Sequence, residues 1–103
     1  MKTVTICGSM RYEEQMKTIS LQLEIAHEFN VLQCVYNPDS IELSNTDRQK
    51  LARSHMKKID LSDAIYVVDI DGYIGESVKG EIEYAKNNQK EIIYHSEFVF
   101  SIA

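Results

Sequence analysis

The chain has 103 residues, of which 44% are hydrophobic and 26% are charged, and its formal net charge is −5. These values are typical of one small globular domain, expected to span residues 1–103, and they disfavour a disordered or membrane-spanning protein. The acidic balance and the lack of a basic run also argue against polymeric nucleic acid as a partner.

The first third of the chain predicts a strand, a helix and a second strand. Residues 4–7 form a short run rich in β-branched residues, which favours a strand. Residues 13–29 carry apolar side chains at helical spacing, and residues 31–36 form a second apolar run. Cys7 and Cys34 lie in these strand-like runs without a preceding signal-peptide pattern, so we expect reduced thiols in a cytoplasmic protein.

The middle of the chain predicts two more helices around a buried strand. A helix is expected from about residue 46 to residue 59, capped by Ser44 or Asn45. Residues 64–69 form an apolar run that reads as a third strand, and residues 77–88 form a helix with an apolar stripe. We expect the Ser77 side chain to cap this last helix.

The pattern ends with a fourth strand at residues 91–94 and an apolar tail at residues 97–102, which is expected to be an edge strand or a helix. Strands that alternate with helices favour a parallel sheet with right-handed crossovers. We therefore expect an α/β, Rossmann-like (flavodoxin-type) three-layer sandwich with a mainly parallel sheet of four to five strands.

The turn after the first strand, Gly8-Ser9-Met10-Arg11, is one candidate binding loop. In an open parallel sheet, ligands bind outside the carboxyl ends of the strands, where this turn is expected to lie. Backbone N–H groups, a hydroxyl group and a guanidinium group before a helix suit an anion such as a phosphate. Ordinary turn chemistry explains the same residues about equally well.

The segment after the third strand is the second candidate. Glu81 is expected in the first turn of its helix, where a carboxylate often serves only to complement the helix dipole. The nearby Gly72, Gly75 and Gly80 allow the backbone to approach a ligand closely. A carboxylate beside a bound sugar can act as a nucleophile at the anomeric carbon, so Glu81 is the leading catalytic candidate.

Asp69, Asp71, Ser77 and His55 complete the set of candidate residues. The first three follow the third strand and are expected in the same crevice as Glu81. His55 lies on the inner half of the second helix, where a packed core residue is the commoner interpretation. The spacing of Cys, His and acidic residues matches no metal motif, so neither a metal nor a cofactor is predicted.

Three segments of the chain resemble the nucleoside 2-deoxyribosyltransferase superfamily, which includes the 2'-deoxynucleoside 5'-phosphate N-hydrolases. Residues 4–11 are similar to the family's first strand and its Gly-Ser-x-Arg loop. Residues 61–69 are similar to its buried strand after an acidic residue. Residues 77–85, with Gly80-Glu81-Ile82-Glu83-Tyr84-Ala85, look like its nucleophile helix.

The resemblance implies a flavodoxin-type fold, a homodimer or higher homo-oligomer, and a nucleoside or nucleotide as the small-molecule partner. It implies that Glu81 attacks the anomeric carbon of a deoxyribose, and that the loop from Gly8 to Arg11 holds a 5'-phosphate. Gly75 and Ser77 would also contact the substrate. The family uses a first-strand tyrosine and an aspartate on the helix before the nucleophile, and Thr5 and His55 stand at or near those positions here.

Two other interpretations of the same residues are open. The chain could be a non-catalytic nucleotide-binding or signalling module that keeps Ser9, Arg11 and the glycine loop. It could also be a structural oligomer in which the acidic corner is only a solvated edge. The fold alone does not decide among them, because this layout supports many chemistries.

Overall fold

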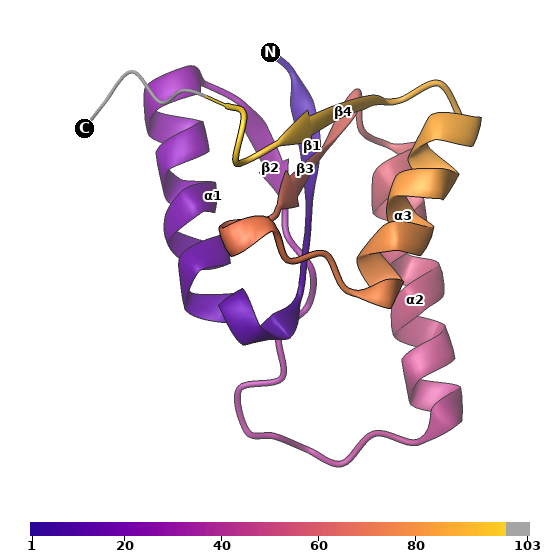
Figure 1. Ribbon diagram of the computed structural model, residues 1–103. Helices are drawn as coiled ribbons and strands as arrows, with labels where there is room; N and C mark the ends of the chain where they lie inside the picture. Colours follow the sequence, from indigo (N-terminus) through magenta and orange to yellow (C-terminus); the bar gives the residue numbers. More distant parts are fainter. Residues whose placement is uncertain (99–103) are drawn as a thin grey trace.

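The computed structural model describes residues 1–98, and it consists of three layers. Helix α1 (Glu13–His27) covers one face of a sheet, and α2 (Asn45–Asp60) and α3 (Glu76–Asn87) cover the other face (Figure 1). The strands are β1 (Thr3–Gly8), β2 (Asn30–Leu32), β3 (Ala64–Val68) and β4 (Glu91–Tyr94).

All neighbouring strands pair in parallel, in the order β2-β1-β3-β4. This is the order of flavodoxin-like doubly wound sheets. The predicted Rossmann-like α/β fold is therefore confirmed, with four strands among residues 1–98.

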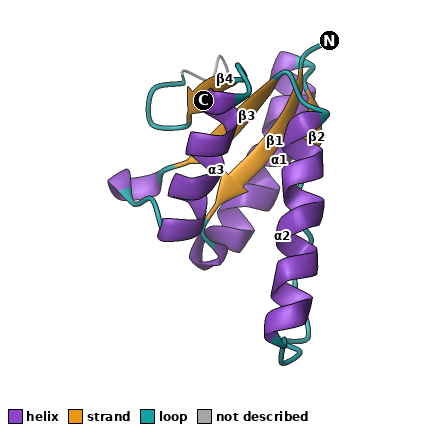
Figure 2. Ribbon diagram, turned by 90° about the vertical axis from the view of Figure 1, so that its right-hand side faces the viewer, coloured by secondary structure: helices purple, strands orange, loops and turns teal. Residues whose placement is uncertain are grey.

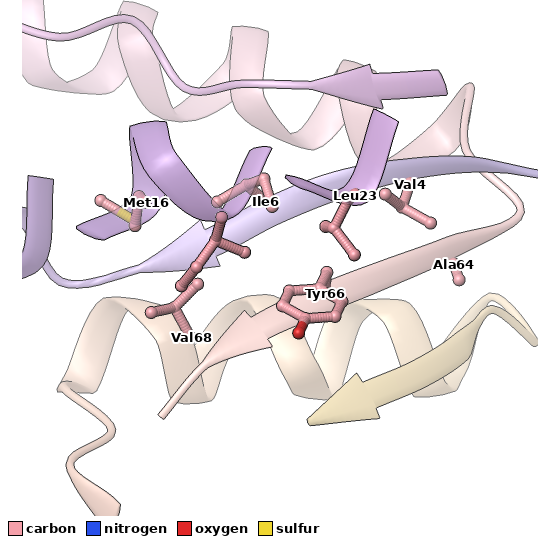
Figure 3. Packing of buried hydrophobic residues seen from close by; sticks show 8 residues of the cluster. Val4, Ile6, Met16, Leu23, Ala64, Tyr66 and Val68 are labelled. Carbon is pink, nitrogen blue, oxygen red and sulfur yellow. The ribbon is translucent and has the colours of Figure 1, made fainter. Parts of the chain in front are cut away.

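The hydrophobic core lies on both faces of the two central strands, because β1 and β3 are buried almost completely. Side chains alternate along a strand, so each strand contributes to two clusters. The cluster beneath α1 contains Val4, Ile6, Met16, Ile19, Leu23, Ala64, Tyr66 and Val68 (Figure 3). The cluster beneath α2 and α3 contains Cys7, Ile59, Ile65, Val67, Val78, Ile82 and Ala85.

Two predicted boundaries in the first third of the chain are wrong. Helix α1 ends at His27 rather than at residue 29, because Glu28 adopts a left-handed conformation with φ of 55°. The second strand spans Asn30–Leu32 rather than residues 31–36, because the chain leaves the edge of the sheet after Leu32. Cys34 and Val35 line a cavity instead of continuing the strand.

Ser44 caps α2, which settles the choice between Ser44 and Asn45. The Ser44 hydroxyl accepts a hydrogen bond from the Asp47 backbone N–H, and the Asp47 carboxylate accepts one from the Ser44 N–H. These two bonds form a capping box. Helix α2 continues past the end of the sheet (Figure 2), and within it Ile59 is the fully buried residue.

The predicted cap of the third helix is wrong. Helix α3 begins at Glu76, with Gly75 at the N-cap position and no hydrogen bond from a capping side chain. Ser77 is therefore a helical residue of the first turn. The third strand also ends one residue earlier than predicted, at Val68.

The end of the described chain packs against the core. Phe98 lies 5.6 Å from Tyr66 and 4.8 Å from His27, measured between ring centroids. Most of the predicted apolar tail, residues 99–102, lies outside the described residues. In the described part of the chain, no helix combines the length and the hydropathy that crossing a membrane requires.

The capping box of α2 gives a first prediction. Replacing Ser44 by alanine leaves the Asp47 N–H without its side-chain acceptor, so the free energy of unfolding should fall by about 1 kcal/mol. Urea denaturation measures this change. The control Ser44→Asp retains a capping oxygen and should stay near wild type; an equal loss in both variants would contradict the capping role.

Candidate functional site

Glu81 lies in the second turn of α3 and not in the first turn, where the sequence predicted it. Because α3 starts at Glu76, the acidic residue of its first turn is Glu76, and Glu81 falls in the second turn. The dipole effect decays within the first turn, so dipole complementation does not explain Glu81. Its side chain is 17% exposed. The carboxylate is thus sheltered but accessible.

Two cavities, each of about 390 Å³, meet at Glu81. The first opens between α2 and the segment after β2; it is lined by Ile6, Gly8, Met10, Cys34, Val35, Asn37, Leu43, Arg48, Leu51, Ala52, Ser54, His55, Lys58, Ser77 and Glu81. The second opens at the start of α3; it is lined by Gly8, Ser9, Met10, Tyr73, Gly75, Glu76, Ser77, Val78 and Glu81. Both volumes suit a small molecule.

The two cavities share Gly8, Met10, Ser77 and Glu81. Four predicted site residues, two from the end of β1 and the turn after it and two from α3, therefore lie where the cavities meet. His55 joins them from α2 in the first cavity, and Ser9 and Gly75 join them in the second. This arrangement follows from the sheet, because parallel strands present their carboxyl ends at one edge.

Glu81, His55 and Cys7 form a cluster of titratable side chains. Oε1 of Glu81 lies 3.2 Å from Nε2 of His55, and the same Nε2 lies 3.5 Å from Sγ of Cys7. The Nδ1 atom of His55 is buried, and no described residue forms a hydrogen bond with it. An N–H at Nε2 therefore has the Glu81 carboxylate as its natural acceptor.

Cys7, and not Thr5, is the residue of β1 that lies beside Glu81. The hydroxyl group of Thr5 is 2.6 Å from that of Ser62, so it belongs to a buried polar pair. Burial raises the pKa of the Cys7 thiol well above its usual value, and the adjacent Glu81 carboxylate raises it further. Such a cysteine is a neutral thiol at physiological pH and a poor nucleophile.

The loop after β1 combines a tight turn with an exposed cation. The Ser9 hydroxyl accepts a hydrogen bond from the Arg11 backbone N–H at the start of a short 3-10 helix (Met10–Tyr12). The Arg11 guanidinium lies 3.8 Å from the ring centroid of Tyr73, which lines the second cavity. This stacking places a positive charge at the edge of that cavity.

Asp69 and Asp71 line neither cavity. The Asp69 carboxylate is buried and accepts hydrogen bonds from the backbone N–H and the hydroxyl group of Ser96, at 2.8 and 2.6 Å. Asp71 is exposed and has a φ of 55° in the turn after β3. The structure thus gives Asp69 a structural role and leaves Asp71 outside the site.

Several lining residues were missed by the sequence reasoning. Arg48, Ala52, His55 and Lys58 follow one another at spacings of three or four along α2, so they share one face. This helical period could have identified Arg48 and Lys58 as companions of His55. Cys34 follows the premature end of β2, and no sequence signal marked that end.

No protein-family model matches the chain, and the comparison with curated proteins gives no significant match. The chemical interpretation of the site therefore depends on its geometry and on the sequence resemblance.

Gly8 and Gly80 give a matched pair of stability predictions. A Cβ atom on Gly8 would lie 2.7 Å from Met16 Sδ and 3.1 Å from Val68 Cβ. Gly8→Ala should therefore lower the free energy of unfolding by about 1–3 kcal/mol through overpacking. A Cβ atom on Gly80 meets nothing within 4 Å, so Gly80→Ala should raise it by about 0.5–1 kcal/mol.

Denaturant unfolding of both variants checks this pair. Unchanged stability of Gly8→Ala would show that β1 and α1 are not packed closely at the edge of the site.

Proposed function

We propose that the protein cleaves the N-glycosidic bond of a deoxynucleoside or deoxynucleotide, or transfers its deoxyribosyl group, with Glu81 as the nucleophile. The observation that carries this proposal is the position of the Glu81 carboxylate at the junction of two cavities, next to His55. A sugar at the junction would have its base in one cavity and its 5' substituent in the other.

The first cavity suits a nucleobase. It is lined by apolar side chains that include Val35, Leu43 and Leu51, and by the polar groups of Asn37 and Ser54. A mainly apolar cavity with a few polar groups binds a flat heterocycle and fixes its orientation.

The second cavity suits a 5'-phosphate. Its wall includes the start of α3 from Gly75 to Val78 and the hydroxyl-bearing Ser9 and Ser77. The N-terminus of a helix attracts anions through its backbone N–H groups and its dipole. Arg11, stacked on Tyr73 at the edge of the cavity, adds a positive charge.

The reaction has two steps. In the first, an oxygen of Glu81 bonds to the anomeric carbon while the bond from that carbon to the base breaks. The base leaves with the bonding electron pair and takes up a proton. In the second step, water or another base attacks the same carbon, and the bond to Glu81 breaks to restore the carboxylate.

His55 supports both steps. An N–H at its Nε2 donates to Oε1 of Glu81, 3.2 Å away, and leaves Oε2 available for attack. His55 also lines the cavity through which the base would leave. Because its Nδ1 is buried, the same Nε2–H would serve in turn: it orients Glu81 before the attack and passes to the leaving base once the carboxylate is bonded to the sugar. The attacking water or base would return a proton to Nε2 in the second step.

Substitution of Glu81 tests the proposal. The protein should release free base from a panel of deoxynucleosides and their 5'-monophosphates, measured by chromatography. Glu81→Gln removes the nucleophile and should lower the rate at least about 10³-fold. The control Glu83→Gln changes an exposed carboxylate two residues away and should keep the wild-type rate.

Two outcomes would contradict it. Base release that is equal in wild type and Glu81→Gln would exclude Glu81 as the nucleophile. Thermal stabilisation by a nucleotide that persists in Glu81→Gln, without any base release by wild type, would instead identify a non-catalytic binding module.

Arg11 gives a prediction about substrate preference. If Arg11 contacts the 5'-phosphate, Arg11→Ala should lower kcat/KM for monophosphates by about 10- to 100-fold, the value of a charge-assisted hydrogen bond. It should leave kcat/KM for nucleosides unchanged. Like Arg11, Arg53 is an exposed cation outside the lining of both cavities, but it lies on α2 and not on Tyr73, so the control Arg53→Ala should affect neither substrate. Equal losses for both substrates would contradict the phosphate contact.

A further inference from the structure

Three metal-ligating groups converge at the site from three separate elements. Cys7 comes from β1, His55 from α2 and Glu81 from α3, and their donor atoms all lie within 4.8 Å of one another. Thiolate sulfur, imidazole nitrogen and carboxylate oxygen are the donors that zinc uses in proteins, and zinc binding would displace the proton of the Cys7 thiol. This combination of sulfur, nitrogen and oxygen donors argues against the hard cations Mg²⁺ and Ca²⁺, because both ions prefer oxygen ligands alone.

Two of the three distances between these donors are close to those around one tetrahedral zinc ion, and the third is at most 4.8 Å. With bonds of about 2.3 Å to sulfur and 2.0–2.1 Å to nitrogen or oxygen, tetrahedral ligands are separated by about 3.6 Å for S and N and about 3.3 Å for N and O. The observed separations are 3.5 Å between Cys7 Sγ and His55 Nε2, and 3.2 Å between His55 Nε2 and Glu81 Oε1.

The surroundings favour a fixed site that is open on one side. Cys7 is 1% exposed, and the His55 and Glu81 side chains are 13% and 17% exposed, so the surrounding core holds all three. The Cys7 thiol lies beside His55 and Glu81, and its contact with the Thr5 carbonyl oxygen is long, at 3.9 Å. His55 and Glu81 both line the first cavity, which leaves room for a fourth ligand.

The geometry points to a zinc site formed by Sγ of Cys7, Nε2 of His55 and Oε1 of Glu81, with its fourth position facing the first cavity. Three protein ligands and one open position are the arrangement of reactive zinc sites, in which water or a donor atom of a bound molecule completes the coordination. Structural zinc sites, in contrast, have four protein ligands.

The inference goes beyond the proposed function and does not require it. Zinc would occupy Nε2 of His55 and Oε1 of Glu81, so the hydrogen bond between these two atoms belongs to the metal-free protein. Zinc binding is measured without a nucleotide, so a negative base-release assay leaves the inference intact. Base release by a metal-free protein that binds no zinc would, conversely, leave the proposed function intact and overturn the zinc site.

A zinc titration in which the protein competes with a chromophoric chelator tests the inference. A phosphine reductant in the buffer keeps both cysteines reduced. Wild type should bind one zinc ion per chain. Cys7→Ser, His55→Asn and Glu81→Gln should each weaken binding at least about 100-fold, since even the loss of an outer partner of a metal ligand costs 10- to 100-fold. Cys34→Ser and Glu83→Gln should bind zinc as wild type does.

The controls are chosen to resemble the ligands. Cys34 is the other cysteine of the chain and also lines the first cavity, and Glu83 is the nearest other carboxylate on α3. An equal loss of binding in Cys34→Ser, or no loss in Cys7→Ser, would overturn the proposed ligand set. If wild type binds no zinc in the titration, the three residues form only a hydrogen-bonded cluster and the proposed site is overturned.

Cobalt provides a second measurement that needs no variant to fold. Co²⁺ replacing zinc at this site should show a thiolate-to-metal charge-transfer band and the intense visible bands of tetrahedral cobalt. Absence of the charge-transfer band in the Co²⁺-loaded wild type would overturn the role of Cys7.

Discussion

The parallel pairing of β1 with β3 is the constraint on which the rest of the structure depends. The pairing runs from Val4 and Ala64 to Gly8 and Val68, and both strands are buried on both faces. After β1 the chain passes to α1 on one face, and after β3 it passes to α3 on the other (Figure 1). The two connections diverge at one edge of the sheet, and the cavities around Glu81 lie there.

Helix α2 contributes to the site although it buries little of its own surface. Ile59 is its fully buried residue, and the helix continues past the sheet (Figure 2). A helix with so small a packed face depends on local stabilisation of its ends, which the capping box of Ser44 and Asp47 supplies. Its exposed length forms a wall of the first cavity and carries His55 over the carboxyl edge of β1.

The sequence predicted the features that depend on short-range periodicity. The fully apolar β3 and the stripe of Val78, Ile82 and Ala85 on α3 are local patterns, and they determined the order of elements. The early end of β2 was not predictable, because the apolar residues that follow it, such as Cys34, line a cavity and do not pair with the sheet. Glu81 and His55 were predicted for the site, but Cys7 was not, because it lies 48 residues before His55 and only tertiary packing brings the two together.

The hydrogen bonds from Ser96 to Asp69 connect the end of the described chain with its centre. Asp69 follows the most buried strand, and its carboxylate loses both donors if the turn after β4 detaches. A buried carboxylate without partners is costly, so this turn cannot fray independently as chain ends usually do. The N–H of Ser96 therefore exchanges with solvent as part of the same cooperative unit as β3, and truncation before this residue would destabilise the whole fold.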